Sequence, residues 1–195
     1  CRVDLFNDLR GDLGNIFAGE VRSGDSLTYK SPSVGGFQAG ATWVTESNGE
    51  SVDSDGEATD GASLGAWYGD DSLKKQPFYA ALAYDSKIKG YDTVRATAYG
   101  KLGPIQLGAV YQQQEAVTTG AKSKDGYLAN AAWTINDFKL LAQFQTLDDK
   151  GDGWSAGGEY ALGKPTKAYL FYTSRDLDAL TDTEDYVGIG LDHRF

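Results

Sequence analysis

The stretch DDKGDGWSAGGE at 148–159 has the residue types and spacing that a calcium-binding loop requires. It matches an EF-hand loop at Asp148, Asp152, Gly153 and Glu159. Lys150, however, stands at a position that should supply a ligand, and the residues that follow alternate as in a strand instead of forming the required helix. We therefore interpret this stretch as a hairpin loop and expect no metal site.

Catalytic chemistry is poorly supported by the side chains present. The only histidine is His193, in the last ten residues, and a nucleophile needs a base within hydrogen-bond reach. The sequence contains no nucleotide-binding loop and no Cys/His set with metal-ligand spacing. With a formal charge of −10, it is also a poor partner for nucleic acid. We expect no catalytic residue, no cofactor and no nucleic-acid partner.

Carboxylates are concentrated in the stretch 45–61, as Glu46, Glu50, Asp53, Asp55, Glu57 and Asp60. A solvated loop is the interpretation we favour. The alternative is a cluster that recruits divalent cations and bridges them to anionic lipid headgroups.

Residues 1–24 carry charges of both signs among apolar residues. The acids are Asp4, Asp8, Asp12 and Glu20, and the bases are Arg2, Arg10 and Arg22. Taken alone, this pattern predicts an amphipathic loop packed against a neighbouring element.

From residue 25 onward the sequence repeats one unit, an alternating apolar and polar segment of about ten residues followed by a polar break. We count eleven such segments, near 25–31, 37–45, 61–69, 77–86, 93–102, 105–114, 126–135, 138–147, 154–162, 166–174 and 185–195. The 25 Gly, 12 Tyr and 4 Trp, with no Met, agree with strands joined by turns. The mean hydropathy of −0.43 excludes a helical membrane protein, but not a transmembrane barrel whose strands average out as hydrophilic.

The apolar stripes place aromatic residues at their ends and small residues in the middle, as in Tyr127, Ala129, Ala131 and Trp133. A soluble β-sandwich has the same period of two. Two features favour a membrane barrel instead. The segments are longer than ordinary soluble strands, and short links (102–104, 135–137, 162–165) alternate with long acidic ones (46–60, 115–125, 175–184). We predict an all-β, antiparallel up-and-down transmembrane barrel.

Eleven strands is an odd number, whereas sequential antiparallel neighbours close a barrel with an even number. We therefore expect these strands to be the C-terminal part of a larger barrel, or to be closed by another chain. Cys1 is interpreted as a fragment boundary, a residue introduced by cloning or an acylated lipoprotein cysteine.

The stretch FNDLRGDLGNIFAGEVRSGDSLTYKSPSVGGF resembles the region of Gram-negative general diffusion porins that ends the constriction loop and enters the next strand, and the closing YVGIGLDHRF is similar to their last strand. The resemblance implies a sixteen-stranded trimeric barrel, of which eleven strands follow the constriction loop. Residues 1–24 would then be the remnant of this loop, and 25–195 would be barrel strands.

The resemblance further implies that acids of the loop face basic residues of the lumen wall and set up a transverse field. We assign Asp8, Asp12 and Glu20 to the acidic side. Because alternate residues of a strand face the lumen, the basic wall is predicted to contain Arg22, Lys30, Arg95, Lys139 and Arg194. Scattered lumen charges that merely solvate a channel remain the alternative for each of them.

The last strand places Val187, Ile189, Leu191 and Phe195 on one face, which we assign to lipid. The resemblance implies that Leu191, His193 and Phe195 form a C-terminal assembly signal. The expected function is passive diffusion of small hydrophilic solutes and ions through the outer membrane of a Gram-negative bacterium, in a homotrimer. The alternative is a structural or interaction barrel component that does not conduct.

Overall fold

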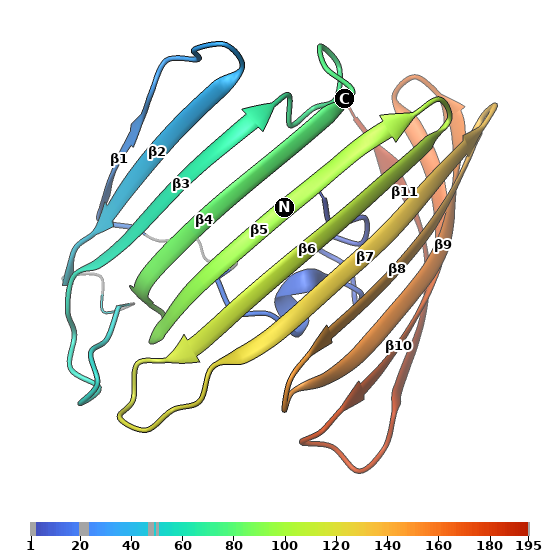
Figure 1. Ribbon diagram of the computed structural model, residues 1–195. Coiled ribbons are helices and arrows are strands. Elements are labelled where there is room, and N and C mark those ends of the chain that lie inside the picture. Colours follow the sequence, from blue (N-terminus) through green and yellow to red (C-terminus); the bar gives the residue numbers. More distant parts are fainter. Residues whose placement is uncertain (1–2, 20–23, 47–48, 50, 195) are drawn as a thin grey trace.

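Eleven strands make up most of the computed structural model, which describes residues 3–19, 24–46, 49 and 51–194 (Figure 1). The strands are β1 (Ser26–Lys30), β2 (Phe37–Val44), β3 (Gly61–Gly69), β4 (Phe78–Ile88), β5 (Tyr91–Leu102), β6 (Ile105–Ala116), β7 (Lys124–Ile135), β8 (Phe138–Leu147), β9 (Gly151–Gly163), β10 (Thr166–Leu177) and β11 (Glu184–His193). One short 3₁₀ helix, η1 (Leu13–Asn15), lies in the N-terminal segment. The predicted number and order of strands are confirmed.

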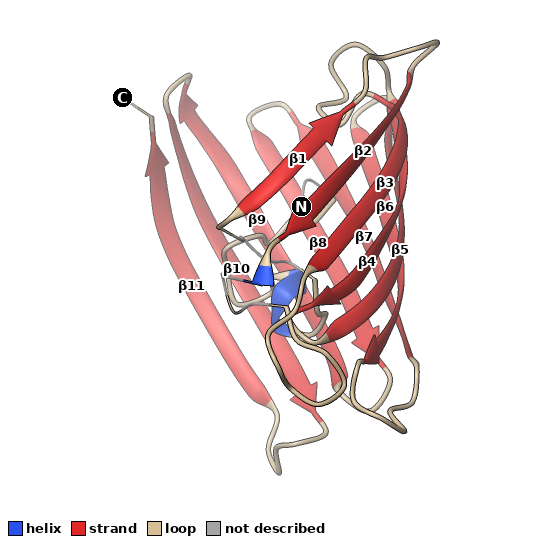
Figure 2. Ribbon diagram, turned by 90° about the vertical axis from the view of Figure 1, so that its left-hand side faces the viewer, coloured by secondary structure: helices blue, strands red, loops and turns tan. Residues whose placement is uncertain are grey.

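All eleven strands form one antiparallel sheet in which each strand pairs with its neighbours in sequence order, from β1 to β11. The sheet is strongly curved, and Figure 2 looks into the gap between β1 and β11, where the barrel is open. The all-β, up-and-down fold is therefore confirmed as a partial barrel. None of the described residues forms a helix long and apolar enough to cross a membrane.

The connections follow the predicted asymmetry in part. Links of two residues (103–104, 136–137, 164–165) join strands at one rim, which we call the short-turn rim, and the longer connections 45–60, 117–123 and 178–183 lie at the opposite rim. Strict alternation is wrong at four places. The connections 31–36 and 70–77 lie at the short-turn rim, whereas the short connection 148–150 and the tight turn of Lys89 and Gly90 lie at the opposite one. Both residues of this turn have positive φ, 53° and 78°. This geometry matches the twist of paired strands and extends β4 and β5 beyond their predicted ends.

The convex face is apolar and ends in aromatic residues at both rims. Near the short-turn rim, the rings of Phe37 and Tyr68, and of Phe138 and Tyr160, lie 4.6 Å apart. Near the opposite rim, Tyr111 contacts Tyr127 at 5.4 Å and Trp154 contacts Tyr172 at 5.0 Å. Aliphatic side chains are exposed on the same face, including Leu64, Leu82, Leu107, Leu140 and Leu170. An apolar band between two aromatic girdles is the surface that a bilayer requires of a barrel.

A charge in the middle of this band should destabilise the barrel, whereas a charge on the concave face should not. Ala129 is exposed on the convex face of β7, and Ala81 of β4 faces the concave side. We predict that Ala129→Arg lowers the free energy of unfolding from lipid vesicles by about 2–4 kcal/mol. The matched Ala81→Arg change should cost much less in the same urea titration. Equal costs would contradict the assignment of the faces.

Candidate functional site

Residues 3–19 lie inside the curve of the sheet (Figures 1 and 2), and they pack against its concave face from β5 to β10. Val3, Leu13, Ile16 and Phe17 are buried with Tyr99, Val110, Leu128 and Leu147 of the wall. Phe6 is buried with Ala132 and Leu141, and its ring meets Phe171 edge-on at 6.5 Å. The amphipathic pattern of this segment is thus explained, because its apolar side packs on the concave face of its own sheet.

Glycines of the wall create the space that the segment occupies. A Cβ atom at Gly126 would come within 2.5 Å of the Phe17 ring and 2.9 Å of Leu147. At Gly108 it would lie 2.7 Å from a methyl group of Val3. The segment therefore fits against the wall because Gly108 and Gly126 carry no side chains.

Amide side chains of the wall supply the hydrogen-bond partners that the buried backbone of the segment needs. Gln143 accepts a hydrogen bond from the Leu5 backbone N–H at 3.0 Å and donates to the Gly11 carbonyl oxygen at 3.1 Å. The Asn130 amide donates to the Val3 carbonyl oxygen. Since Asn130 and Gln143 are register partners on β7 and β8, two neighbouring strands hold the same part of the segment.

Asp4 is the buried charge at the centre of this contact. Its carboxylate accepts hydrogen bonds from the backbone N–H groups of Phe6 and Leu13, at 2.9 and 2.7 Å, and from the Gln143 amide at 2.9 Å. Burial raises the pKa of the Asp4 carboxyl, and the three hydrogen bonds oppose this shift. Asp4 is not among the predicted site residues; a lone acid between Val3 and Leu5 is its only sequence signal.

Arg95 holds the other end of the segment. Its Nη2 donates to the Ala18 carbonyl oxygen at 2.8 Å, and its Nε donates to Gln112 Oε1 at 2.6 Å. The Gln112 amide also donates to the Ala18 carbonyl oxygen, at 2.9 Å, while Gln114 accepts from the Ala18 N–H at 3.0 Å. Arg95 does face the lumen, as its position in the strand predicted, and its guanidinium is bound to the backbone of the segment.

The predicted acidic residues have different surroundings. Asp8 is exposed on the segment with a φ of 64°, and Asn7 donates a hydrogen bond to its carboxylate at 2.7 Å. The carboxylate of Asp12 accepts from the backbone N–H groups of Asp8 and Gly14, and so it caps η1. Glu20 lies outside the described residues. The role of these acids in a transverse field stays a prediction.

The predicted basic residues are spread over the lumen. Lys139 is the register partner of Glu159, which in turn binds Lys167 across to β10. Arg194 follows β11 and lines a small cavity of about 210 Å³ at the short-turn rim. Lys30 lies over the Trp67 ring, at 5.1 Å from its centroid, in a separate cavity. Arg22 lies outside the described residues, so the basic wall as a whole also stays a prediction.

Two arginines stack on one tyrosine, an arrangement that the sequence pattern did not predict. The guanidinium carbons of Arg10 and Arg175 lie 4.8 and 5.1 Å from the centroid of the Tyr186 ring. Arg175 is buried and donates to Glu184 Oε2 at 2.7 Å. These contacts join the segment to β10 and β11. Only the alternation of β10, read one residue beyond its predicted end at 174, would have placed Arg175 in the lumen.

Two further predicted features can be placed. Residues 148–159 form a turn and the start of β9, whose Glu159 is bound to Lys167, and the described residues contain no group of side chains suited to a metal ion. At the C-terminal end, Leu191 and His193 are exposed, and the His193 ring is hydrogen-bonded to the Thr166 hydroxyl at 2.7 Å. Phe195 lies outside the described residues, and the assembly signal stays a prediction.

Filling the space at Gly126 should release the segment from the wall. We predict that Gly126→Val displaces Phe17 and costs about 1–3 kcal/mol of docking energy. Amide hydrogen exchange of the peptide covering 3–19, followed by mass spectrometry, should then speed up about tenfold. Gly158→Val is the matched control, because a Cβ at Gly158 meets no atom closer than 3.9 Å. Unchanged exchange in Gly126→Val would contradict the docked arrangement.

Removing the Gln143 amide should weaken docking in a pH-dependent way. Because burial raises the pKa of Asp4, its contribution to docking is greatest below the normal carboxyl pKa and is lost as the pH rises through the raised value. Gln143→Leu removes a hydrogen bond to the charged form, worth about 1.5–3 kcal/mol. We predict that Gln143→Leu speeds up exchange of segment 3–19, relative to the unsubstituted protein, more at pH 7 than at pH 4. Both rates are corrected for the intrinsic pH dependence of exchange. A pH-independent effect would argue against a charged Asp4 in this contact.

Comparison with known proteins agrees with this geometry. The family of Gram-negative porins matches residues 3–180. Among solved structures, the anion-selective porin from Comamonas acidovorans is similar with a TM-score of 0.68 and 17% identity, over 89% of this chain and 60% of that one. A porin refined at 1.8 Å resolution gives a TM-score of 0.66 and 19% identity, over 87% and 61% of the two chains.

A mutant of the Rhodopseudomonas blastica porin is similar with a TM-score of 0.59 and 14% identity, over 87% and 54% of the two chains. The chain thus spans about 60% of the length of the most similar of these porins. No curated protein sequence matches it significantly. The match that covers most of the chain, together with the shared barrel architecture, shows that the chain belongs to the family of Gram-negative porins, which are located in the outer membrane.

Proposed function

We propose that the eleven strands form part of the wall of a water-filled channel, through which small hydrophilic solutes and ions diffuse passively across the outer membrane. The observation that carries this proposal is the pairing of an apolar, girdled convex face with a polar concave face that holds a docked segment. A lumen lined by amides and charges is one that water and ions can fill. In this role the protein is a channel and not an enzyme.

β1 and β11 are the two edge strands of the sheet, and each must pair with another strand before the channel is closed. In lipid, unpaired strand edges are too costly to persist. We therefore infer that the wall is completed by strands other than the eleven described here. Assembly into a homotrimer is part of the proposal, and it draws its support from the family alone.

The docked segment is proposed to set ion preference as well as pore width. Asp8 is exposed on it, and the lumen wall also carries Arg95, Lys139 and Lys167. Charges on both sides of a narrow opening act on each passing ion, and they do so less strongly at high salt. The predicted pairing of Asp8, Asp12 and Glu20 against Arg22, Lys30, Arg95, Lys139 and Arg194 belongs to this proposal.

Planar-bilayer recording of the native outer-membrane protein tests the proposal. We expect ohmic steps whose reversal potential in a KCl gradient shifts toward anions in Asp8→Asn. A unit charge about 8 Å from an ion in water contributes roughly 0.5 kcal/mol, with opposite sign for cation and anion, so their permeability ratio should change by about fivefold. Asp182→Asn, in the outer connection 178–183, is the control and should change it less. Absence of any steps from folded protein would support the non-conducting structural alternative.

A further inference from the structure

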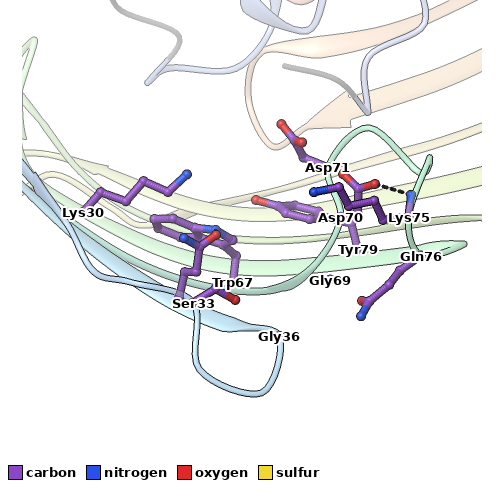
Figure 3. A pocket seen from close by; sticks show the side chains of 11 residues that line it. Lys30, Ser33, Gly36, Trp67, Gly69, Asp70, Asp71, Lys75, Gln76 and Tyr79 are labelled. Carbon is purple, nitrogen blue, oxygen red and sulfur yellow. Dashed lines mark hydrogen bonds between the residues drawn. The ribbon is translucent and has the colours of Figure 1, made fainter.

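A second cavity lies on the lumen side at the short-turn rim, apart from the docked segment. Its volume is about 520 Å³, and β1, β2, β3, β4 and the connections 31–36 and 70–77 line it. Figure 3 shows Lys30, Trp67 and Tyr79 around its floor, with Asp71 and Lys75 on the far side. Most of its lining lies outside the buried cluster that holds segment 3–19, and Tyr79 is the lining residue that also packs against that cluster.

The floor of the cavity is the face of an indole ring. Trp67 lies over Gly40, where a Cβ atom would be only 3.1 Å from its Cη2 and 3.3 Å from its Cζ3. Its Nε1 donates to Gln38 Oε1 at 3.2 Å, which fixes the orientation of the ring. One face of the indole is thus laid against the sheet, and the other is turned to the lumen, where Lys30 lies over it. A flat, fixed aromatic face is a stacking platform for a ring.

The far wall of the cavity is rigid. Asp70 accepts hydrogen bonds from Ser72 N–H and Oγ–H and from the backbone N–H groups of Lys74 and Lys75, at 2.6–2.9 Å. The hydrogen bond from Lys75 N–H is the main one of those that hold the pKa of the Asp70 carboxyl well below its usual range. The Tyr99 hydroxyl donates to the Asp71 carbonyl oxygen at 2.6 Å. The connection 70–77 is therefore preorganised, whereas the exposed Lys30 side chain can move.

From these features we propose that the cavity is a binding subsite for small ring-bearing carboxylates. The ring stacks on the open face of Trp67, and the Lys30 ammonium moves from the indole to pair with the carboxylate. On the far side Lys75 adds a positive charge beside the carboxylates of Asp70 and Asp71, and the Asp70 carboxylate already accepts four hydrogen bonds from its own connection. The subsite goes beyond the proposed channel function and does not depend on ion preference at the docked segment.

Ligand-observed NMR titration of the folded protein in detergent tests the subsite, with benzoate as the probe. Saturable binding is expected. Trp67→Leu should weaken it about tenfold and Trp67→Phe much less, although both lose the hydrogen bond to Gln38. Lys30→Gln should weaken it about fivefold, whereas Lys101→Gln, a lumen-side lysine at the same rim, should leave it unchanged.

Glucuronate and glucose, both ring-bearing, separate the contributions of ring and charge. Glucuronate should bind and compete with benzoate, and glucose should not. No saturable benzoate binding, equal binding in Trp67→Leu, equal binding in Lys30→Gln, or glucose binding as tight as glucuronate would each overturn the subsite. Because binding is measured without a membrane, such a result leaves the conductance test of the channel intact, and a loss of conductance leaves the subsite intact.

Discussion

A bilayer offers no hydrogen-bond partner to a peptide group, and the rest of the structure depends on this constraint. Every spanning strand must pair along its whole length, so the eleven strands form one continuous antiparallel ladder in sequence order. Once pairing is continuous, the side-chain period of two divides each strand into a lipid face and a lumen face. The constraint on the backbone therefore decides which side chains can meet a solute.

The same requirement applies in a different form inside the barrel. Segment 3–19 has little regular structure, so its buried backbone groups need partners from elsewhere. Gln143, Gln112 and Asn130 supply them from the wall, and Arg95 does so with a charged group. An aliphatic wall would have packed the apolar side chains equally well but would have left the carbonyl oxygens of Val3, Gly11 and Ala18 unpaired. The amides explain why the segment lies in one place.

The sequence was sufficient to predict the strands and their faces, because a period of two over ten residues is a local signal. From their positions in the strands alone, Arg95 and Lys139 were predicted to face the lumen. The sequence was less exact at the rim opposite the short turns, where β9 begins at Gly151 and β10 ends at Leu177. At that rim, polar residues continue to pair beyond the apolar stripe, so an apolar pattern underestimates strand length.

Local signals could not show where segment 3–19 docks. The hydrogen bond between Asp4 and Gln143 joins residues 139 positions apart, and nothing in either neighbourhood indicates the other. Asp12 was predicted to be a field-setting acid, and its carboxylate also caps a turn of the segment. Charge alone does not distinguish a residue that acts on a solute from one that shapes the backbone.

The segment also makes the two halves of the concave face unequal. It packs on β5–β10 and approaches β4 at Gly19, near the carboxylate of Asp85. The lumen side of β1–β3, with Thr28 hydrogen-bonded to Thr42 and with Trp67 beyond them, lies to one side of these contacts. A solute in the proposed channel would be directed along this side, because the other is filled. The Trp67 cavity lies at the short-turn end of that route, where a stacking face and a mobile ammonium would act on solutes after the docked segment.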